Sequence, residues 1–313
     1  MAKLTKALIV PEFGTGKINL YGHGPMPVGQ PGYAVDMQAV LDNLFPGQGR
    51  TAAPNCCKLY GVDLFVTLSS ADSQCIVKLP SYLSDPATAQ AQAFIFTLDG
   101  NDYVGLAFDA AGNLWAADYL NHRVVAFDVG GLDITNTNRF HVLANEPGSL
   151  PVSNSDLALS GPTSNLFAEP EGLDFDTFGP MADLWISNNN DGGAGGVTNV
   201  LTTLVKVTKS LQDVVLATAN AGTVAAADVV LNSNCFIYQV PNGAAGRPQF
   251  GGLQIDKAAK WLYVTEEVGG VVRAYDLATI AATPATPAGS LLPITTTNPG
   301  NGGLALVTYG PQF

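Results

Sequence analysis

The chain has few charged residues. Asp, Glu, Lys and Arg make up 13% of its 313 residues, and 14 Lys and Arg stand against 26 Asp and Glu, a formal net charge of −12. Nucleic-acid binding depends on basic side chains that neutralise phosphates. The composition therefore excludes DNA, RNA and anionic membranes as partners. It is more usual in an extracellular or periplasmic β protein than in a cytosolic enzyme.

Long apolar runs are also missing. No run reaches the roughly 18 residues that a membrane helix needs, so we expect no membrane span. The N-terminal residues pass directly into strand-like residues 7–10, without an apolar segment and a small-residue cleavage site. We therefore expect no signal peptide in this sequence, and an extracellular or periplasmic location is inferred from composition alone.

The residues of familiar catalytic motifs are scarce. The three histidines form no metal cluster or triad, and there is no Gly-x-Ser-x-Gly, phosphate loop or dinucleotide fingerprint. His122 belongs to a turn, where we expect a structural role. The four cysteines form no Cys-x-x-Cys pair. They could form two disulfides or be small buried hydrophobic residues, and they stand at Cys56, Cys57, Cys75 and Cys235.

What the chain does contain is a repeated pattern of three short phrases. Residues 105–109, 114–118 and 123–128 read Gly-Leu-Ala-Phe-Asp, Leu-Trp-Ala-Ala-Asp and Arg-Val-Val-Ala-Phe-Asp. Related phrases return at 172–176, 184–188 and 204–207, and at 252–256, 262–266 and 271–276. In another copy the first phrase stands at 303–307 and the other two at 8–12 and 17–21. A further block, at 63–68, 74–79 and 94–98, lacks the Gly-Leu opening.

These phrases predict strands, and their repetition predicts a β-propeller. They are five to seven residues long, rich in Val, Leu, Ile and aromatic residues, and separated by Gly, Asn and Asp. We predict an all-β fold with residues 1–313 as a single β-propeller domain, its ring closed by a C-terminal strand joining the N-terminal strands. Five repeats are legible, and residues 225–240 suggest a degenerate sixth. We therefore prefer six blades, with five as the alternative, and expect short helices only near 34–45 and 86–93.

The third repeat, at 105–128, resembles an NHL repeat almost throughout. The opening Pro-Glu-Gly-Leu-Asp-Phe-Asp at 170–176 also fits that repeat, and both resemble the six-bladed propellers of the senescence-marker-protein-30/gluconolactonase group. The resemblance covers about two thirds of the chain. In lactonases of this group, a cation held by Glu, Asn and Asp at the channel mouth polarises an ester carbonyl and activates water.

The repeat alignment places polar residues at one rim of the ring. The end of the second strand, which lies on the same side as the start of the innermost strand, carries Glu12, Asp118, Asn188 and Glu266. Glu171 stands just before the first-strand glycine. Oxygen ligands converging there would suit Ca²⁺, and the resemblance assigns its ligand roles to Glu171, Asn188 and Asp118. Alternatively, Asp and Asn stand there because they bond their own backbone at turns.

Two functions follow as expectations. The first is a secreted or surface binding or assembly module that holds a protein or small-molecule ligand on its loop-rich faces, with self-association as a further option. Its long insertions stand near 22–55, 130–168 and 220–247. The alternative is a metal-dependent hydrolase of the lactonase type, although the group's usual N-terminal Glu-Gly-Pro is missing. The sequence leaves open whether the protein is an enzyme.

Overall fold

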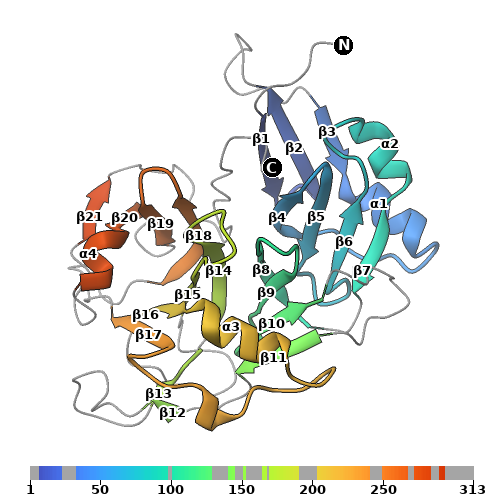
Figure 1. The fold of residues 1–313 in the computed structure, drawn as a ribbon. Helices are drawn as coiled ribbons and strands as arrows, with labels where there is room; N and C mark the ends of the chain where they lie inside the picture. The colour runs from blue at the N-terminus through green and yellow to red at the C-terminus, as the bar shows by residue number, and fades with distance from the viewer. Residues whose placement is uncertain are drawn as a thin grey trace.

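The structure is a computed structural model. It describes residues 7–22, 33–97, 101–128, 140–144, 151–152, 164–167, 169–189, 203–239, 249–266, 271–282 and 289–292. Within these ranges the chain folds as an all-β propeller of five sheets, which follow one another around a ring in chain order (Figure 1). Contacts between successive sheets run from β1 to β4, then to β8, β14 and β18.

The first sheet has three described strands and each of the others has four. The first consists of β1 (Ala7–Glu12), β2 (Lys17–Gly22) and β3 (Tyr33–Asp36). The second consists of β4 (Pro54–Tyr60), β5 (Asp63–Leu68), β6 (Cys75–Leu79) and β7 (Phe94–Thr97). The third consists of β8 (Tyr103–Phe108), β9 (Leu114–Asp118), β10 (Arg123–Phe127) and β11 (Phe140–Ala144).

The last two sheets have the same order. The fourth consists of β14 (Pro170–Phe175), β15 (Leu184–Asn188), β16 (Thr203–Val207) and β17 (Cys235–Gln239). The fifth consists of β18 (Phe250–Asp256), β19 (Trp261–Glu266), β20 (Val271–Asp276) and β21 (Gly289–Leu292). A small extra sheet pairs β12 (Pro151–Val152) with β13 (Ser164–Asn165). Neighbouring strands within every sheet are antiparallel.

The preference for six blades is wrong, because the suspected sixth repeat belongs to the fourth sheet. Residues Cys235–Gln239 pair with β16 and form its outer strand, β17. The residues before them form a short 3₁₀ helix, Ala226–Asp228, instead of a further strand of a new sheet. A long connection that contains the helix α3 (Lys209–Leu216) separates β16 from β17. Because this outer strand stands far from β16 in the sequence, it looks like part of a separate, degenerate repeat.

The other helices are short. The two predicted ones are confirmed as α1 (Met37–Leu44) and α2 (Pro86–Ala91). Asp85 caps α2 by accepting from the Thr88 amide at 3.2 Å, and proline occupies its first turn, as the sequence predicts. The helices α3 and α4 (Leu277–Ala282) are not predicted from the sequence. None of the helices in the described ranges is long and apolar enough to span a membrane.

The hydrophobic core lies between adjacent blades. Four clusters of buried side chains occupy the four successive contacts from the first sheet to the fifth. In the contact between the third and fourth sheets, for example, Trp115 packs edge-on against Phe175 with ring centroids 6.4 Å apart. Each blade therefore depends on its neighbours for burial, as expected for a repeat fold.

The Gly-Leu phrase is explained by the close approach of the inner strands. A methyl group added at Gly105 would lie 1.8 Å from the carbonyl oxygen of Glu171 on the next inner strand. One added at Gly172 would lie 2.2 Å from the amide nitrogen of Leu253. Only glycine fits at these two positions without a shift of the neighbouring backbone.

None of the four cysteines forms a disulfide, which agrees with the second of the two alternatives left open by the sequence. Three of them are buried, and burial raises the pKa of Cys235 to about 12. The thiols therefore behave as apolar core groups and not as reactive nucleophiles.

The predicted closing strand at 303–307 lies outside the described residues. The first sheet has β1 at one edge, and β1 corresponds to the second strand of the other blades. Ring closure by the C-terminal segment therefore stays a prediction.

Candidate functional site

The strand register confirms which positions share one side of the ring. Each inner strand begins opposite the end of its second strand, so that Tyr103 pairs with Asp118, Pro170 with Asn188 and Phe250 with Glu266. We call this side the mouth face. The opposite side, which carries the turns from inner to second strands and from third to outer strands, is the turn face.

Each inner strand has an irregularity near the mouth face. The register shifts shortly after its first residue in all four complete sheets. The shift ends at the glycine Gly105 in the third sheet and at the residue after the glycine or its equivalent in the other three. A hydroxyl on the second strand bonds the shifted backbone in three of them. Ser187 Oγ accepts from the Gly172 amide at 2.9 Å and donates to the Gly251 carbonyl at 2.7 Å. Thr67 and Thr265 make related contacts with Cys56 and Gly252.

The four predicted rim residues point into their own blades. Arg123 Nε donates to Asp118 Oδ2 at 2.6 Å, and Arg273 Nε donates to Glu266 Oε2 at 2.6 Å. Asn188 and Glu12 likewise bond Thr203 at 2.8 Å and Thr15 at 2.7 Å. None of these contacts joins one rim residue to another. The sequence therefore places the four residues on the correct side, while these four contacts each lie within one blade.

Burial raises the pKa of two carboxyl groups on this face, Asp118 and Asp102. Asp118 is fully buried, and burial raises its pKa although Arg123 partly offsets the effect. Burial also raises the pKa of nearby Asp102 to about 6, and the negative charge of Asp118 adds to this increase. The Asp102 carboxyl group therefore takes up its proton at a higher pH than an exposed aspartate does.

A polar group surrounds Glu171 between the third and fourth sheets. Glu171 is half-buried, and Asn189 Nδ2 donates to its Oε1 at 2.6 Å. The amide of the buried Glu169 donates to His122 Nδ1 at 3.1 Å, and the Asn189 amide donates to the Glu169 carbonyl at 2.9 Å. His122 thus makes a structural contact, as expected. Glu169 and Asn189 are not among the predicted site residues, although each adjoins a phrase of the repeat.

Asn188 supplies one atom that could receive a ligand. Its amide nitrogen is bound by Leu166 and Thr203, but its buried Oδ1 has no hydrogen-bond partner among the described residues. Among all the residues that the structure describes, no three Asp, Glu, His or Cys side chains are grouped closely enough to hold a metal ion. The cation site assigned to Glu171, Asn188, Asp118, Glu266 and Glu12 therefore stays a prediction.

A second polar group, which the sequence analysis missed, lies at the centre of the ring. Lys58, Ala107, Asp174 and Gln254 occupy equivalent positions on the four inner strands. Lys58 Nζ lies 3.5 Å from Asp174 Oδ1 and 3.4 Å from Gln254 Oε1, and Gln254 Nε2 donates to Asp174 Oδ2. Since Lys58 and Asp174 belong to sheets that are not neighbours, they meet across the centre, beside the small side chain of Ala107.

A second lysine completes this central cluster. Lys257 Nζ lies 3.1 Å from Asp174 Oδ1, and both side chains are almost fully buried. Burial alone would raise the pKa of Asp174, but Lys58, Lys257 and the Ile255 amide outweigh it and hold the pKa below its ordinary value. Burial lowers the pKa of Lys257, which Asp174 offsets only in part. The cluster is a compact set of buried charges at the level where a propeller channel would run.

Comparisons with known proteins agree with the propeller fold. No family model matches the chain, and neither does any curated protein. Among solved structures, a chain from a nidogen/laminin complex is similar with a TM-score of 0.52 at 12% identity, covering 91% of this chain and 77% of that one. Virginiamycin B lyase from Staphylococcus aureus is similar with a TM-score of 0.46 at 12% identity, covering 95% and 72%. At these identities the likeness concerns the fold alone.

Proposed function

We propose that the protein is a binding or assembly module, a single propeller domain that holds a protein or small-molecule ligand on its loop-bearing faces. The central cluster of Lys58, Asp174, Gln254 and Lys257 is the observation that carries this proposal. These side chains bond one another across the ring. Their charges are therefore engaged with each other and not directed at a substrate in the centre. The low charge content supports an extracellular or periplasmic location.

A second candidate is a metal-dependent hydrolase of the lactonase type. Its support is the buried Asn188 Oδ1 without a partner, together with Glu171 close by in the same sheet. Oxygen donors of this kind fit a hard cation such as Ca²⁺. Glu171 and Asn188 would hold the ion, which would polarise the carbonyl of a bound ester. The other rim carboxylates are bound by arginine or threonine within their own blades.

Calcium titration and turnover of simple lactones distinguish the two functions. We expect Ca²⁺ to raise the melting temperature slightly, by an amount that grows with the logarithm of its concentration, and we expect no lactone turnover. Glu171→Gln should reduce the response to Ca²⁺. Glu12→Gln, a control on the same rim but in the first sheet, should leave it unchanged. Substantial turnover that Glu171→Gln abolishes would establish the hydrolase instead, and a melting temperature indifferent to Ca²⁺ would remove the cation site.

A further inference from the structure

Exposed apolar side chains are concentrated on the turn face. Of the large hydrophobic residues that are most exposed in the described ranges, only Phe13 and Leu120 lie on the mouth face. The other seven lie on the turn face: Tyr60, Val62, Leu83, Phe178, Met181, Val214 and Val230. The two most exposed are Phe178 at 60% and Met181 at 76%. Both stand in the turn between β14 and β15, which we call the apolar tip (residues 176–183).

The apolar tip is held in one shape by its own hydrogen bonds. The Asp176 amide donates to the Asp183 carbonyl at 3.1 Å, and the Asp183 amide donates to Asp176 Oδ1 at 3.0 Å. The Ala182 amide donates to the Gly179 carbonyl at 3.2 Å. Lys257 Nζ lies 4.8 Å from the centre of the Phe178 ring. Since the exposed side chains stand on an ordered turn, a partner would lose little free energy in fixing them.

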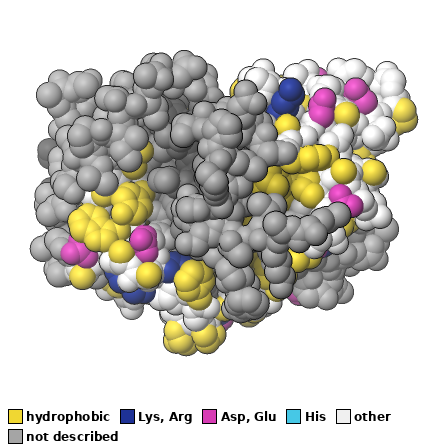
Figure 2. Space-filling view, turned by 90° about the horizontal axis from the view of Figure 1, so that it is seen from above, with side chains coloured by type: hydrophobic (Ala, Val, Ile, Leu, Met, Phe, Trp, Pro, Cys, Tyr) yellow, Lys and Arg dark blue, Asp and Glu magenta, His cyan; other side chains and the backbone are white. Residues whose placement is uncertain are grey.

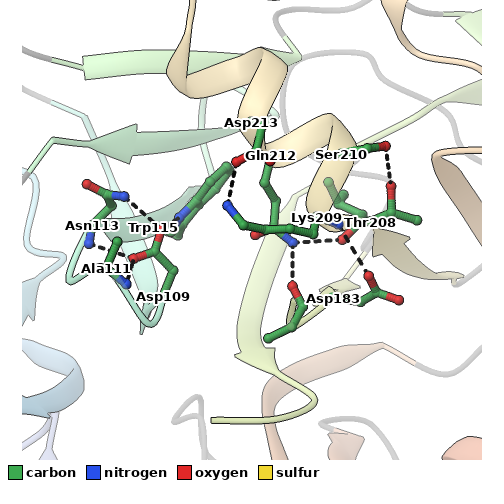
Figure 3. A network of polar contacts seen from close by, with 12 residues as sticks. Asp109, Ala111, Asn113, Trp115, Asp183, Thr208, Lys209, Ser210, Gln212 and Asp213 are labelled. Carbon is green, nitrogen blue, oxygen red and sulfur yellow. Dashed lines mark hydrogen bonds and ion pairs between the residues drawn. The ribbon is translucent and has the colours of Figure 1, made fainter. Parts of the chain in front are cut away.

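Three lysines on the turn face pair with carboxylates, whereas the exposed Lys260 donates to the backbone carbonyl of Asp176 at 3.1 Å. Lys78 pairs with Asp63 at 2.7 Å, and Lys206 pairs with Asp183 at 3.6 Å. Figure 3 shows Lys209 on α3 reaching Asp213, with Asp183 beside the start of the helix. The positive charges of Lys78, Lys206 and Lys209 are thus balanced by neighbouring carboxylates.

Several carboxylates on the same face have no such partner. In the described ranges, no lysine or arginine pairs with Asp85, Asp109, Asp228 or Asp256. The hydrogen bonds that Asp85, Asp109 and Asp256 accept come from neutral N–H and hydroxyl groups. Asp109 and its neighbours Asn113 and Trp115 are visible beside α3 in Figure 3. The turn face therefore combines exposed apolar side chains with an excess of negative charge. Figure 2 shows one side of the molecule, where hydrophobic areas have charged side chains of both signs at their edges.

We propose that the turn face docks a protein partner whose surface combines apolar side chains with lysine and arginine, with Phe178 and Met181 as the apolar anchors. The negative charge favours a basic partner. It disfavours an anionic membrane, and it disfavours a second copy of this chain, which would bring the same acidic face against it. This inference deepens the proposed binding function, on which it rests.

Binding of a labelled amphipathic peptide of leucine and lysine, followed by fluorescence anisotropy, tests the proposal. The wild type should bind this peptide more weakly as salt rises, and it should not bind the matching peptide of leucine and glutamate. The double variant Phe178→Ser/Met181→Ser should bind at least about tenfold more weakly. The control Phe13→Ser/Leu120→Ser, which removes the two exposed apolar residues of the mouth face, should bind like the wild type. Thermal melts verify that both variants are folded.

Three results would overturn the docking surface. They are an absence of peptide binding, equal binding by the wild type and the Phe178→Ser/Met181→Ser variant, and self-association in sedimentation that this variant abolishes. Any of these without lactone turnover would leave the binding function standing and remove only the turn face. Lactone turnover abolished by Glu171→Gln would instead remove the binding function itself, so the two failures can be told apart.

Discussion

At the scale of single residues, the most consequential side chain is Asp174. It stands on an inner strand whose other residues are mainly apolar, and it meets two lysines and a glutamine from two other sheets and an adjoining turn. A buried carboxylate is tolerated only where such partners compensate for its lost hydration. Asp174 thus ties together sheets that are not neighbours in the ring.

Asp174→Asn should lower the free energy of unfolding by about 3 kcal/mol or more, because it leaves two buried lysines facing an uncharged group. Urea denaturation measures the change. Asp213→Asn, which breaks the ion pair of an exposed carboxylate with Lys209, is the matched control and should cost less than about 1 kcal/mol. Equal effects of the two substitutions would show that the central cluster contributes no more to stability than an exposed ion pair does.

The pH dependence of that contribution follows from the lowered pKa of Asp174. Since the folded state holds the carboxylate ionised, the stabilisation is present at neutral pH and above the ordinary carboxyl range. It is lost as pH falls through the lowered pKa of the folded state. The difference in stability between the wild type and Asp174→Asn should therefore shrink in acid.

At the scale of elements, the phrases of the repeat predict the inner and second strands well because these strands carry the residues with the strictest packing. The Gly-Leu opening marks the place where neighbouring inner strands nearly touch. Outer strands are less constrained, and β17 was therefore mistaken for part of a separate blade. The rim residues were placed on the right side of the ring, but the direction of Asp118 and Glu266 depends on arginines of the third strand, which the repeat alignment does not fix.

Gly105→Ala should destabilise the contact between the third and fourth sheets. The added methyl group would overlap the Glu171 carbonyl, so one inner strand must move. We expect a loss of about 3 kcal/mol or more in the free energy of unfolding, measured by chemical denaturation. Gly14→Ala, whose methyl group would meet nothing within 4 Å, should change stability little. A variant at Gly105 as stable as the one at Gly14 would refute the close approach.

At the scale of the whole molecule, the number of blades and the filling of the centre could not be predicted together. Contact between Lys58 and Asp174 depends on how tightly the inner strands converge, which depends on the blade count. A polar residue at the same place in two phrases, Asp174 and Gln254, was the available signal, whereas Lys58 lies on a strand that lacks the phrase. This signal becomes informative only when the ring is known.

Ring closure gives a prediction at this scale. Residues 303–307 carry the inner-strand phrase, and the first sheet has three described strands where the others have four. Deleting residues 300–313 should leave two unpaired strand edges. The truncated protein should be insoluble or lose its cooperative thermal transition in calorimetry. A truncated protein that melts like the intact chain would show that the two ends do not pair.

The central claim concerns a five-bladed ring whose centre is filled by its own charged side chains. We propose that this ring binds its ligand on its loop-bearing faces. A crystal structure determined from crystals soaked in Ca²⁺ tests it most directly. We predict five sheets, contact between Lys58 Nζ and Asp174 Oδ1 across the centre, and no ion bound to Asp174. A sixth sheet, or a cation coordinated by Asp174 on the axis of the ring, would contradict the claim.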